Sequence, residues 1–470
     1  MSTVAQKFLQ DAAVKSADLV HREIIRRGME SYEAAHLRGR SRIVDWEAAR
    51  QRCQAIKREA INHLDRYLLQ FEEKVIAHGG HVFWAADGKE ACAYIRNLAT
   101  SRKVRTVVKS KSMVTEEIQL APVLEEAGIT VWETDLGEYI VQLRNEPPYH
   151  IVTPAMHLNR RQISELFKEK IGEEVQGDDP AELVALARRT LRKPFFSAEM
   201  GISGANFLVA DAGVIAISTN EGNGRLCTSI PRIHVAVTGI EKVIPRLEDL
   251  AVLWPVLATS GTGQGITTYS TLIGGPRGDG EADGPEEFHV VLVDNGRSKL
   301  LADPEQREVL HCIRCGACLN ICPVFRNVGG HTYGTTYPGP IGSVLTPHLR
   351  GREFEHLSYA SSLCGACTSV CPVKINLHHH LLHNRRNTTE AGDTKWTERA
   401  MFRFWRFAML HPRIYAFGGW LGRSALRMLY GLGMAGSMVD PMRAWNRRRS
   451  PVPLPKESFR SRWRREIGKH

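Results

Sequence analysis

The stretch "HCIRCGACLNICPVF", residues 311–325, has a partner further along the chain, "SSLCGACTSVCPV", residues 361–373. Each stretch contains Cys-Gly-Ala-Cys and ends its cysteine run with Cys-Pro. The first has cysteines at 312, 315, 318 and 322, and the second has them at 364, 367 and 371. Ser361 stands where the second stretch would have its first cysteine. The two stretches are therefore an internal repeat with unequal numbers of thiols.

The spacing Cys-x-x-Cys-x-x-Cys-x-x-x-Cys-Pro is the run that binds [4Fe–4S] clusters in bacterial ferredoxins. Three closely spaced thiolates hold three irons of one cluster, and the fourth thiolate holds the other cluster. This crossover rule predicts that cluster 1 is held by Cys312, Cys315, Cys318 and Cys371. Cluster 2 is then held by Cys322, Cys364 and Cys367.

One iron of cluster 2 lacks a cysteine from this set. Three outcomes fit: a [3Fe–4S] cluster, a [4Fe–4S] cluster completed by Ser361 or water, or one completed by Cys227 or a partner chain. We expect two [4Fe–4S] clusters, with [3Fe–4S] as the alternative for cluster 2. Zinc also binds four thiolates from Cys-x-x-Cys pairs. Zinc sites do not require the x-x-x-Cys-Pro continuation, however, and it occurs twice here.

Working outward from the cysteines, the chain divides into four segments. Residues 1–75 read as helices because apolar residues recur at helical spacing without internal proline. Residues 76–300 alternate strand-like and helix-like stretches, which predicts an α/β domain with a largely parallel sheet. Residues 301–392 contain the two motifs and form the predicted α-helical, ferredoxin-like module. Residues 393–470 form a basic, amphipathic C-terminal region.

Short apolar runs mark the strands expected in the α/β domain. They are "HVFWA", "RTVVKS", "TVWETD", "HIVTPA", "GVIAIST", "RIHVAVTGI" and "FHVVLVDN". Helices are expected between them, as in "TEEIQLAPVLEEAG" and "AELVALARRTLRK".

A loop after "GVIAIS" is a candidate ligand site. It offers Glu221, Asn223 and Arg225 beside two glycines. Loops at the carboxyl ends of parallel strands commonly bind ligands, although a plain Asn-Gly turn is the alternative. Cys227 follows within the same loop and reads as a buried structural thiol. No catalytic residue is predicted.

Positive charge is concentrated at the C-terminus. Residues 401–470 hold 15 Lys or Arg against 3 acidic residues, whereas the whole chain has a net charge of +11. The remainder is therefore nearly neutral, so we do not expect nucleic acid to bind across the surface. The tail also carries Trp and Phe, which predicts contact either with a membrane interface or with a protein surface.

The chain shows no secretory signal and no run of eighteen apolar residues. Seven of its ten cysteines fall in the two motifs, which suits a reducing compartment. We therefore expect a cytoplasmic protein, with the tail allowing peripheral contact at the inner face of the membrane.

Several blocks of the α/β domain, taken with the two unequal motifs, resemble the lactate utilization protein B family. They are "SKSMVTEEI" (110–118), "ETDLGEYIVQL" (133–143), "HIVTPAMHLNR" (150–160) and the long block "GANFLVADAGVIAISTNEGNGRLCTSIPRIHVAVTGIEKV" (204–243). The resemblance implies a LUD domain, similar in fold to CoA-transferases and ribose-phosphate isomerases, joined to a dicluster module. It also implies seven cluster cysteines, so Ser361 follows the family pattern.

The family resemblance implies action with two other lactate utilization proteins in the oxidation of L-lactate to pyruvate, which allows growth on lactate. Because the chain has no flavin or nicotinamide fingerprint, we expect an electron-transfer component rather than a complete enzyme by itself. Its partners would then include an electron donor and an acceptor protein or quinone. The rival hypothesis is that the α/β domain is an acyl- or CoA-transferring enzyme whose clusters are structural or sensory. A nucleic-acid-binding regulator is a third hypothesis.

Overall fold

The computed structural model describes residues 2–173, 177–392, 396–446, 449–451 and 453–467. The chain divides into two compact units, one ending at Asn387 and the other beginning at Thr388.

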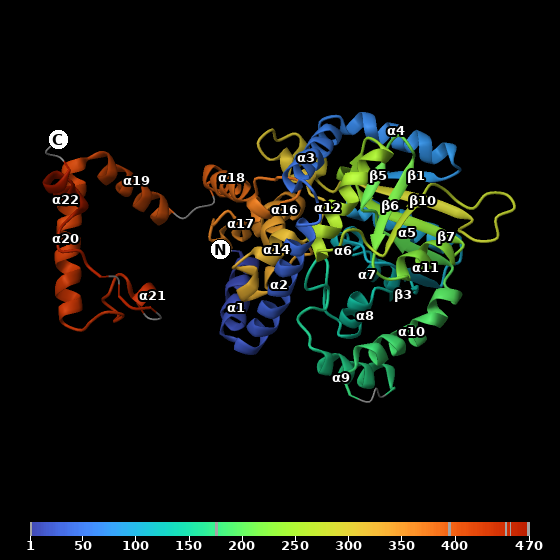
Figure 1. Cartoon of the computed structure of the whole chain (residues 1–470), viewed down its shortest axis with the longest axis horizontal. Coiled ribbons are helices and arrows are strands. Elements are labelled where there is room, and N and C mark those ends of the chain that lie inside the picture. The colour runs from blue at the N-terminus through green and yellow to red at the C-terminus, as the bar shows by residue number, and fades with distance from the viewer. Residues whose placement is uncertain (1, 174–176, 393–395, 447–448, 452, 468–470) are drawn as a thin grey trace. The chain divides into compact units, whose positions relative to one another are not determined.

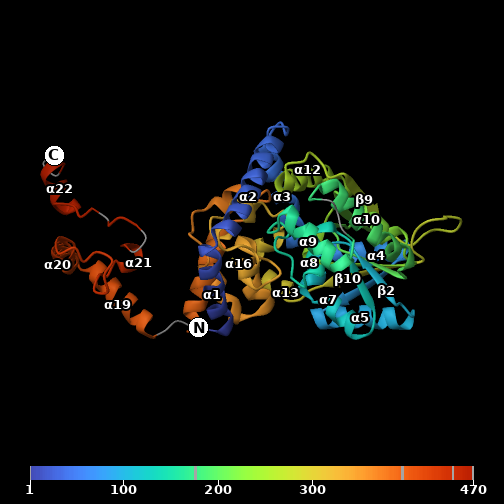
Figure 2. The same ribbon diagram turned by 90° about the horizontal axis from the view of Figure 1, so that it is seen from below.

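Four helices open the first unit: α1 (Thr3–Ala17), α2 (Leu19–Arg40), α3 (Trp46–Asn62) and α4 (Leu64–Ala77). The side chains of Ser2, Asp18 and Asp45 accept hydrogen bonds from the first turns of α1, α2 and α3. Such capping satisfies amide groups that have no partner within the helix. The helices predicted for this segment are therefore present. Figures 1 and 2 show α1 and α2 lying against the cysteine-containing part of the chain, whereas α4 lies over the sheets.

A six-stranded sheet forms the centre of the α/β domain, and all of its pairings are parallel. In spatial order its strands are β1 (His81–Ala85), β10 (Glu287–Val293), β7 (Ile233–Gly239), β4 (Met200–Ser203), β2 (Thr106–Lys109) and β3 (Thr130–Glu133). Every residue of β7 is buried. A strand with both faces covered by other elements reads as a continuous apolar run. The parallel α/β prediction is confirmed.

Helices cover both faces of this sheet. One face packs against α5 (Gly88–Ser101) and α7 (Leu120–Glu126). At the β2 end, the other face packs against α8 (Leu136–Leu143), α9 (Arg160–Ile171), α10 (Pro180–Ser197) and α11 (Asn223–Ser229). Further helical segments are η1 (Ile240–Lys242), η2 (Leu247–Asp249), α12 (Leu250–Thr262) and α13 (Arg297–Leu301). Helix α12 packs against α2 and α3, and α13 packs against the cysteine module.

A second, four-stranded sheet was not predicted. Its order is β8 (Val243–Ile244), β5 (Phe207–Val209), β6 (Val214–Thr219) and β9 (Tyr269–Ile273), and β6 runs antiparallel to both neighbours. The run "GVIAIST" is therefore a strand, but it does not belong to the parallel sheet. The argument that placed Glu221 at the carboxyl edge of a parallel strand was wrong, although the strand itself was predicted.

Three local expectations also need correction. His150–Ala155 is not a strand, because Nδ1 of His150 accepts the amides of Val152 and Thr153 and so folds the chain into a turn. The helix expected near residue 115 is interrupted at Gln119, whose φ of 56° ends α6 (Met113–Glu117) before α7 begins. The loop expected around Cys227 is helix α11.

The cysteine module consists of short helices, as predicted. They are η3 (Arg307–His311), α14 (Ala317–Ile321), α15 (Phe325–Val328), η4 (His331–Tyr333), α16 (Gly339–Arg350), η5 (Arg352–Tyr359), α17 (Ala366–Val370) and α18 (Leu377–Glu390). One apolar core runs from the N-terminal helices through the four-stranded sheet into this module. The module is thus built into the first unit rather than attached through a linker.

The second unit contains α19 (Trp396–Leu410), α20 (Pro412–Gly431), α21 (Arg443–Asn446) and α22 (Phe459–Glu466). None of these helices has a buried residue, and large apolar side chains such as Trp405, Phe417 and Trp420 are exposed. Within the described residues, no helix is both long and apolar enough to cross a membrane.

Candidate metal centre and an adjoining cavity

The two cysteine motifs have nearly the same backbone conformation. Arg314 and Leu363, at equivalent positions, have φ angles of 60° and 54°. Gly316 and Gly365 follow with φ angles of 80° and 79° and begin the five-residue helices α14 and α17. These two helices pack against each other. The internal repeat in the sequence is therefore a structural repeat that brings the two thiol-rich loops together.

The seven cysteines gather in two groups, and none forms a disulfide. In the first group, Cys315 interacts electrostatically with both Cys312 and Cys371, and Cys318 interacts with Cys312 and Cys315. In the second group, Cys367 interacts with Cys322 and Cys364. Cys318 also interacts with Cys367, so the two groups adjoin. We call them the first group (Cys312, Cys315, Cys318, Cys371) and the second group (Cys322, Cys364, Cys367).

The surroundings of these thiols suit bound metal. Burial raises the pKa of Cys371 to about 12 and that of Cys367 to about 11, so the thiolate forms need compensating positive charge. Backbone amides already point at the sulfurs: Arg314 N–H donates to Cys312 Sγ (3.4 Å), and Ile375 N–H donates to Cys371 Sγ (3.3 Å). Hydrogen bonds to the sulfurs are one of the features by which proteins tune iron–sulfur clusters. The donor set and its amides therefore fit such clusters.

Ser361 takes the place in its loop that Cys312 takes in the first. Leu363 N–H donates to Ser361 Oγ at 3.1 Å, just as Arg314 N–H donates to Cys312 Sγ. Cys227 lies elsewhere: it is fully buried in the core of α8, α9 and α10, and its Sγ is 3.2 Å from Thr134 Oγ1. Its placement agrees with a structural thiol and not with a ligand shared by the second group.

Several buried cations interact with the first group, whereas Arg326 interacts with Cys322 of the second. Lys57, Lys242 and Arg314 all interact electrostatically with Cys312. Lys57 and Lys242 are buried, and burial lowers their pKa values to about 7 and about 8. In the second group Cys364 is exposed. The first group is therefore the more buried and the more positively surrounded of the two.

A buried ion network joins the module to the α/β domain. Arg297 pairs with Glu117 (2.8 Å) and with Glu241 (2.6 Å), and each of these three side chains is at most 2% exposed. Arg314 of the first motif pairs with Glu241 at 3.3 Å, while Tyr337 donates to Glu117 at 2.7 Å. The shared carboxylates hold the first cysteine loop in a fixed relation to the sheets.

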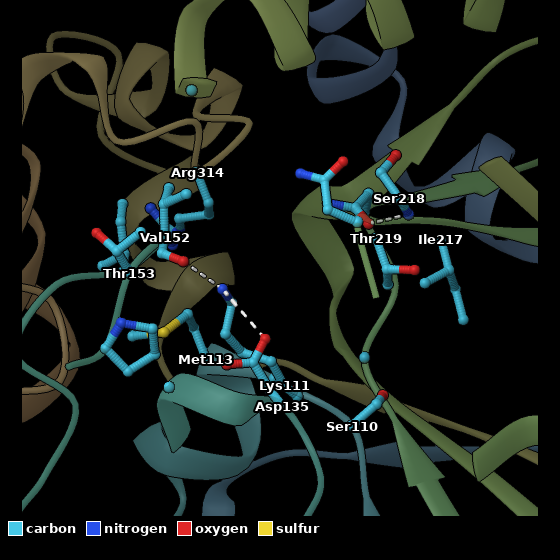
Figure 3. Close-up of a pocket in the computed structure, with 18 of the residues that line it drawn as sticks. Ser110, Lys111, Met113, Asp135, Val152, Thr153, Ile217, Ser218, Thr219 and Arg314 are labelled. Atoms are coloured by element: carbon cyan, nitrogen blue, oxygen red, sulfur yellow. Dashed lines mark hydrogen bonds and ion pairs between the residues drawn. The ribbon is translucent and has the colours of Figure 1, made fainter. Parts of the chain in front are cut away.

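A cavity of about 470 Å³ opens between the α/β domain and the first cysteine loop. Its lining includes Arg314 and Cys315 from the module together with Lys242, the last residue of η1. Figure 3 shows Arg314 and Val152 on one side, with Ser218 and Thr219 across from them. Lys111 lies at the base, where it donates to the carbonyl of Val152 and pairs with Asp135 at 3.9 Å.

The candidate ligand loop only partly faces this cavity. Glu221 and Asn223 line it, but Arg225 is not among its lining residues and stacks on Tyr269 instead. Burial, and then the charge of Asp135, raise the pKa of Glu221 to about 7. Glu221 can therefore gain or lose a proton near neutral pH.

Two arrangements had no clear sequence signal. The ammonium of Lys109 is buried and pairs with Glu116, Glu133 and Glu138. Glu146, His157 and His331 approach one another from distant segments, with ligand atoms within 4.8 Å of one another. Tertiary contacts bring Glu146, His157 and His331 together, and such contacts leave no local pattern in the sequence.

The fold and the cysteine site define an iron–sulfur protein with an α/β LUD domain. Residues 68–293 match the LUD domain family, and residues 308–375 match the 4Fe-4S dicluster domain family. The chain belongs to the lactate utilization protein B family. It is 44% identical over 458 residues to lactate utilization protein B of Shouchella clausii, which covers 97% of this chain and 94% of the relative.

Two further relatives agree with this assignment. Lactate utilization protein B of Geobacillus kaustophilus is 46% identical over 88% of this chain and 87% of its own. The uncharacterized electron transport protein YkgF of Escherichia coli is 43% identical over 90% of each chain.

Proposed function

We propose that this chain holds two [4Fe–4S] clusters and transfers electrons within a multi-protein complex that oxidises L-lactate to pyruvate. The observation that carries the proposal is the pairing of two thiol groups across a structural repeat, in a chain whose relatives are named for lactate utilization and electron transport. Bound clusters supply one-electron chemistry with potentials set by charge, hydrogen bonding and exposure.

The first group supplies four thiolates for cluster 1, and the second group supplies three for cluster 2. The electrostatic proximity of Cys371 to Cys315, and of Cys322 to Cys367, supports this crossover. We assign the fourth donor of cluster 2 to Oγ of Ser361, because it accepts the same backbone hydrogen bond as Cys312 Sγ.

The surroundings of the two groups support different roles for the two clusters in electron transfer. Lys57, Lys242 and Arg314 place positive charge near Cys312, which stabilises added electrons and favours a higher potential for cluster 1. Cys364 is exposed and puts cluster 2 within reach of a partner protein. Cluster 2 is therefore the point of exchange with a partner, and cluster 1 lies beside the cavity.

The partners we propose are two other lactate utilization proteins, with a donor protein on one side and an acceptor protein or quinone on the other. Seven of the ten cysteines lie in the two metal-binding motifs, and this supports a cytoplasmic location. The exposed aromatic side chains and arginines of α19 and α20 support peripheral contact of the tail with anionic membranes.

Growth on L-lactate tests this function. A host that depends on this gene is complemented with Cys315→Ser or with the control Cys92→Ser, which changes a buried thiol of α5 in the α/β core. We expect Cys315→Ser to abolish growth on L-lactate but not on glucose, and Cys92→Ser to support both. A Cys315→Ser chain that folds, retains cluster 2 and still supports growth on L-lactate would contradict the electron-transfer role.

A further inference from the structure

The cavity beside Cys315 has the size of a small-molecule site. Its volume of about 470 Å³ lies within the range of ligand pockets, roughly 300–1,000 Å³. It is formed where segments of both sheets, the turn at residues 151–156 and the first cysteine loop come together. An occupant would therefore touch both the LUD domain and the protein shell of cluster 1.

One wall of this cavity carries positive charge with unused hydrogen-bonding capacity. Arg314 stacks on Tyr337 at 4.4 Å and gives Nη2 to Glu241, but its buried Nη1 has no partner among the described residues. Lys242 is only 6% exposed, and among the described residues its ammonium forms no hydrogen bond or ion pair. The carboxylate that pairs with Arg314, Glu241, is already shared with Arg297.

Some cations near Cys312 interact with the thiolates but do not line the cavity, and Lys57 is an example. Lys57 also interacts with Cys312, but its ammonium is held by the carbonyls of Glu241 (2.6 Å) and Val243 (3.2 Å), and it does not line the cavity. Lys242 and Arg314 do line it. Their unpaired hydrogen-bond donors are therefore available to an occupant of the cavity as well as to cluster 1.

The facing wall is lined by hydroxyl groups, and the two acidic lining residues of the cavity, Asp135 and Glu221, interact with each other and with Lys111. Ser218 and Thr219 of β6 lie across from Arg314, and Ser218 Oγ is buried without a partner among the described residues (Figure 3). Asn206 holds this strand by accepting the amide of Ser218 at 2.8 Å. A hydroxyl or carbonyl group of an occupant can pair with this wall while an anionic group pairs with the other.

We propose that this cavity binds a small organic carboxylate of the 2-hydroxy or 2-oxo acid class, with its carboxylate on Arg314 and Lys242. A planar guanidinium matches a planar carboxylate through paired hydrogen bonds. The inference rests on the proposed function, because it places the substrate class of the complex against the wall of cluster 1. Binding there alters the charge beside Cys315 and therefore the properties of cluster 1.

Calorimetry on the anaerobically purified, cluster-loaded full chain tests the proposal. L-lactate and pyruvate are titrated alongside lactamide, which keeps the hydroxyl group but lacks the charge, and inorganic phosphate, an anion of different shape. We expect saturable binding of one or both carboxylates, with no binding of lactamide or phosphate. The reduction potential of cluster 1 should shift with the bound fraction, and by more than that of cluster 2.

Two lysine variants separate binding from simple tuning of the cluster. Lys242→Met should weaken carboxylate binding at least about tenfold, since a hydrogen bond to a charged group is lost. Lys57→Met removes an equally buried cation near Cys312 and should alter the potential of cluster 1 but leave the affinity within about twofold. Ser218→Ala, on the facing wall, provides a second binding variant if Lys242→Met does not fold.

Equal binding of lactamide or phosphate, or no carboxylate binding at all to iron-replete protein, would overturn the inference. Such a result leaves the electron-transfer role intact if Cys315→Ser still abolishes growth on L-lactate. If Cys315→Ser instead supports growth on L-lactate, the proposed function is contradicted, whatever the cavity binds.

Discussion

Ser361 is the residue at which the two otherwise similar cysteine loops differ. Its Oγ accepts the amide of Leu363, as Cys312 Sγ accepts that of Arg314, so a donor atom already occupies the equivalent position. Serine oxygen is a harder ligand than thiolate and gives a cluster different electronic properties without removing a coordination position.

Replacing Ser361 tests this assignment. Ser361→Ala should lower the iron content from about eight to about seven per chain and produce the EPR signal of an oxidised [3Fe–4S] cluster. Ser361→Cys should keep about eight irons and shift the signal of cluster 2. Ser369→Ala, at an exposed hydroxyl of α17, is the control. An alanine variant with unchanged iron and spectra would assign the fourth position to water or a partner.

Arg297 holds together the buried network between the domains. Removing it leaves Glu117 and Glu241 without their shared cation, and breaking a buried ion pair typically costs about 3–5 kcal/mol. We expect Arg297→Met to reduce the free energy of unfolding by about that amount in chemical denaturation. Arg277→Met, which breaks an exposed pair with Glu286, should change it by less than about 1 kcal/mol. Similar effects for both variants would contradict a special role of the network.

At the scale of elements, sequence periodicity predicted the parallel sheet well because its strands are apolar on both faces. It failed where a side chain folds the backbone locally. The ring of His150 accepts hydrogen bonds from two backbone amides, and the apolar run that follows it is therefore a turn and not a strand. It also failed for the second sheet, because the pairing of β6 with β9 joins segments far apart in the chain. Such pairings depend on tertiary contacts that no local pattern encodes.

The C-terminal helices α19 and α20 carry a prediction of their own. Exposed aromatic side chains with interspersed arginines favour binding at an anionic membrane interface. The full chain should therefore sediment with vesicles containing phosphatidylglycerol and dissociate as salt is raised. Vesicles of neutral phosphatidylcholine are the control. A chain ending at residue 395 should stay in the supernatant, and equal sedimentation of both chains would exclude the tail as the binding element.

At the scale of the whole molecule, the cysteine spacing predicted which thiols gather in two groups, and their role as cluster ligands stays a prediction. Cysteine repeats are local patterns with fixed geometry, so they can be read from sequence. The cations near Cys312 come from α3, η1 and the motif itself, and the cavity joins segments from Ser110 to Tyr337. These features exist only after folding, and they give the two groups different environments.

Iron and inorganic sulfide analysis of the anaerobically purified chain, combined with EPR of its oxidised and dithionite-reduced forms, tests the electron-transfer role most directly. Two [4Fe–4S] clusters predict about eight irons and eight sulfides per chain, with two interacting signals that appear on reduction. Zinc in place of iron, or iron that dithionite cannot reduce, would contradict the role.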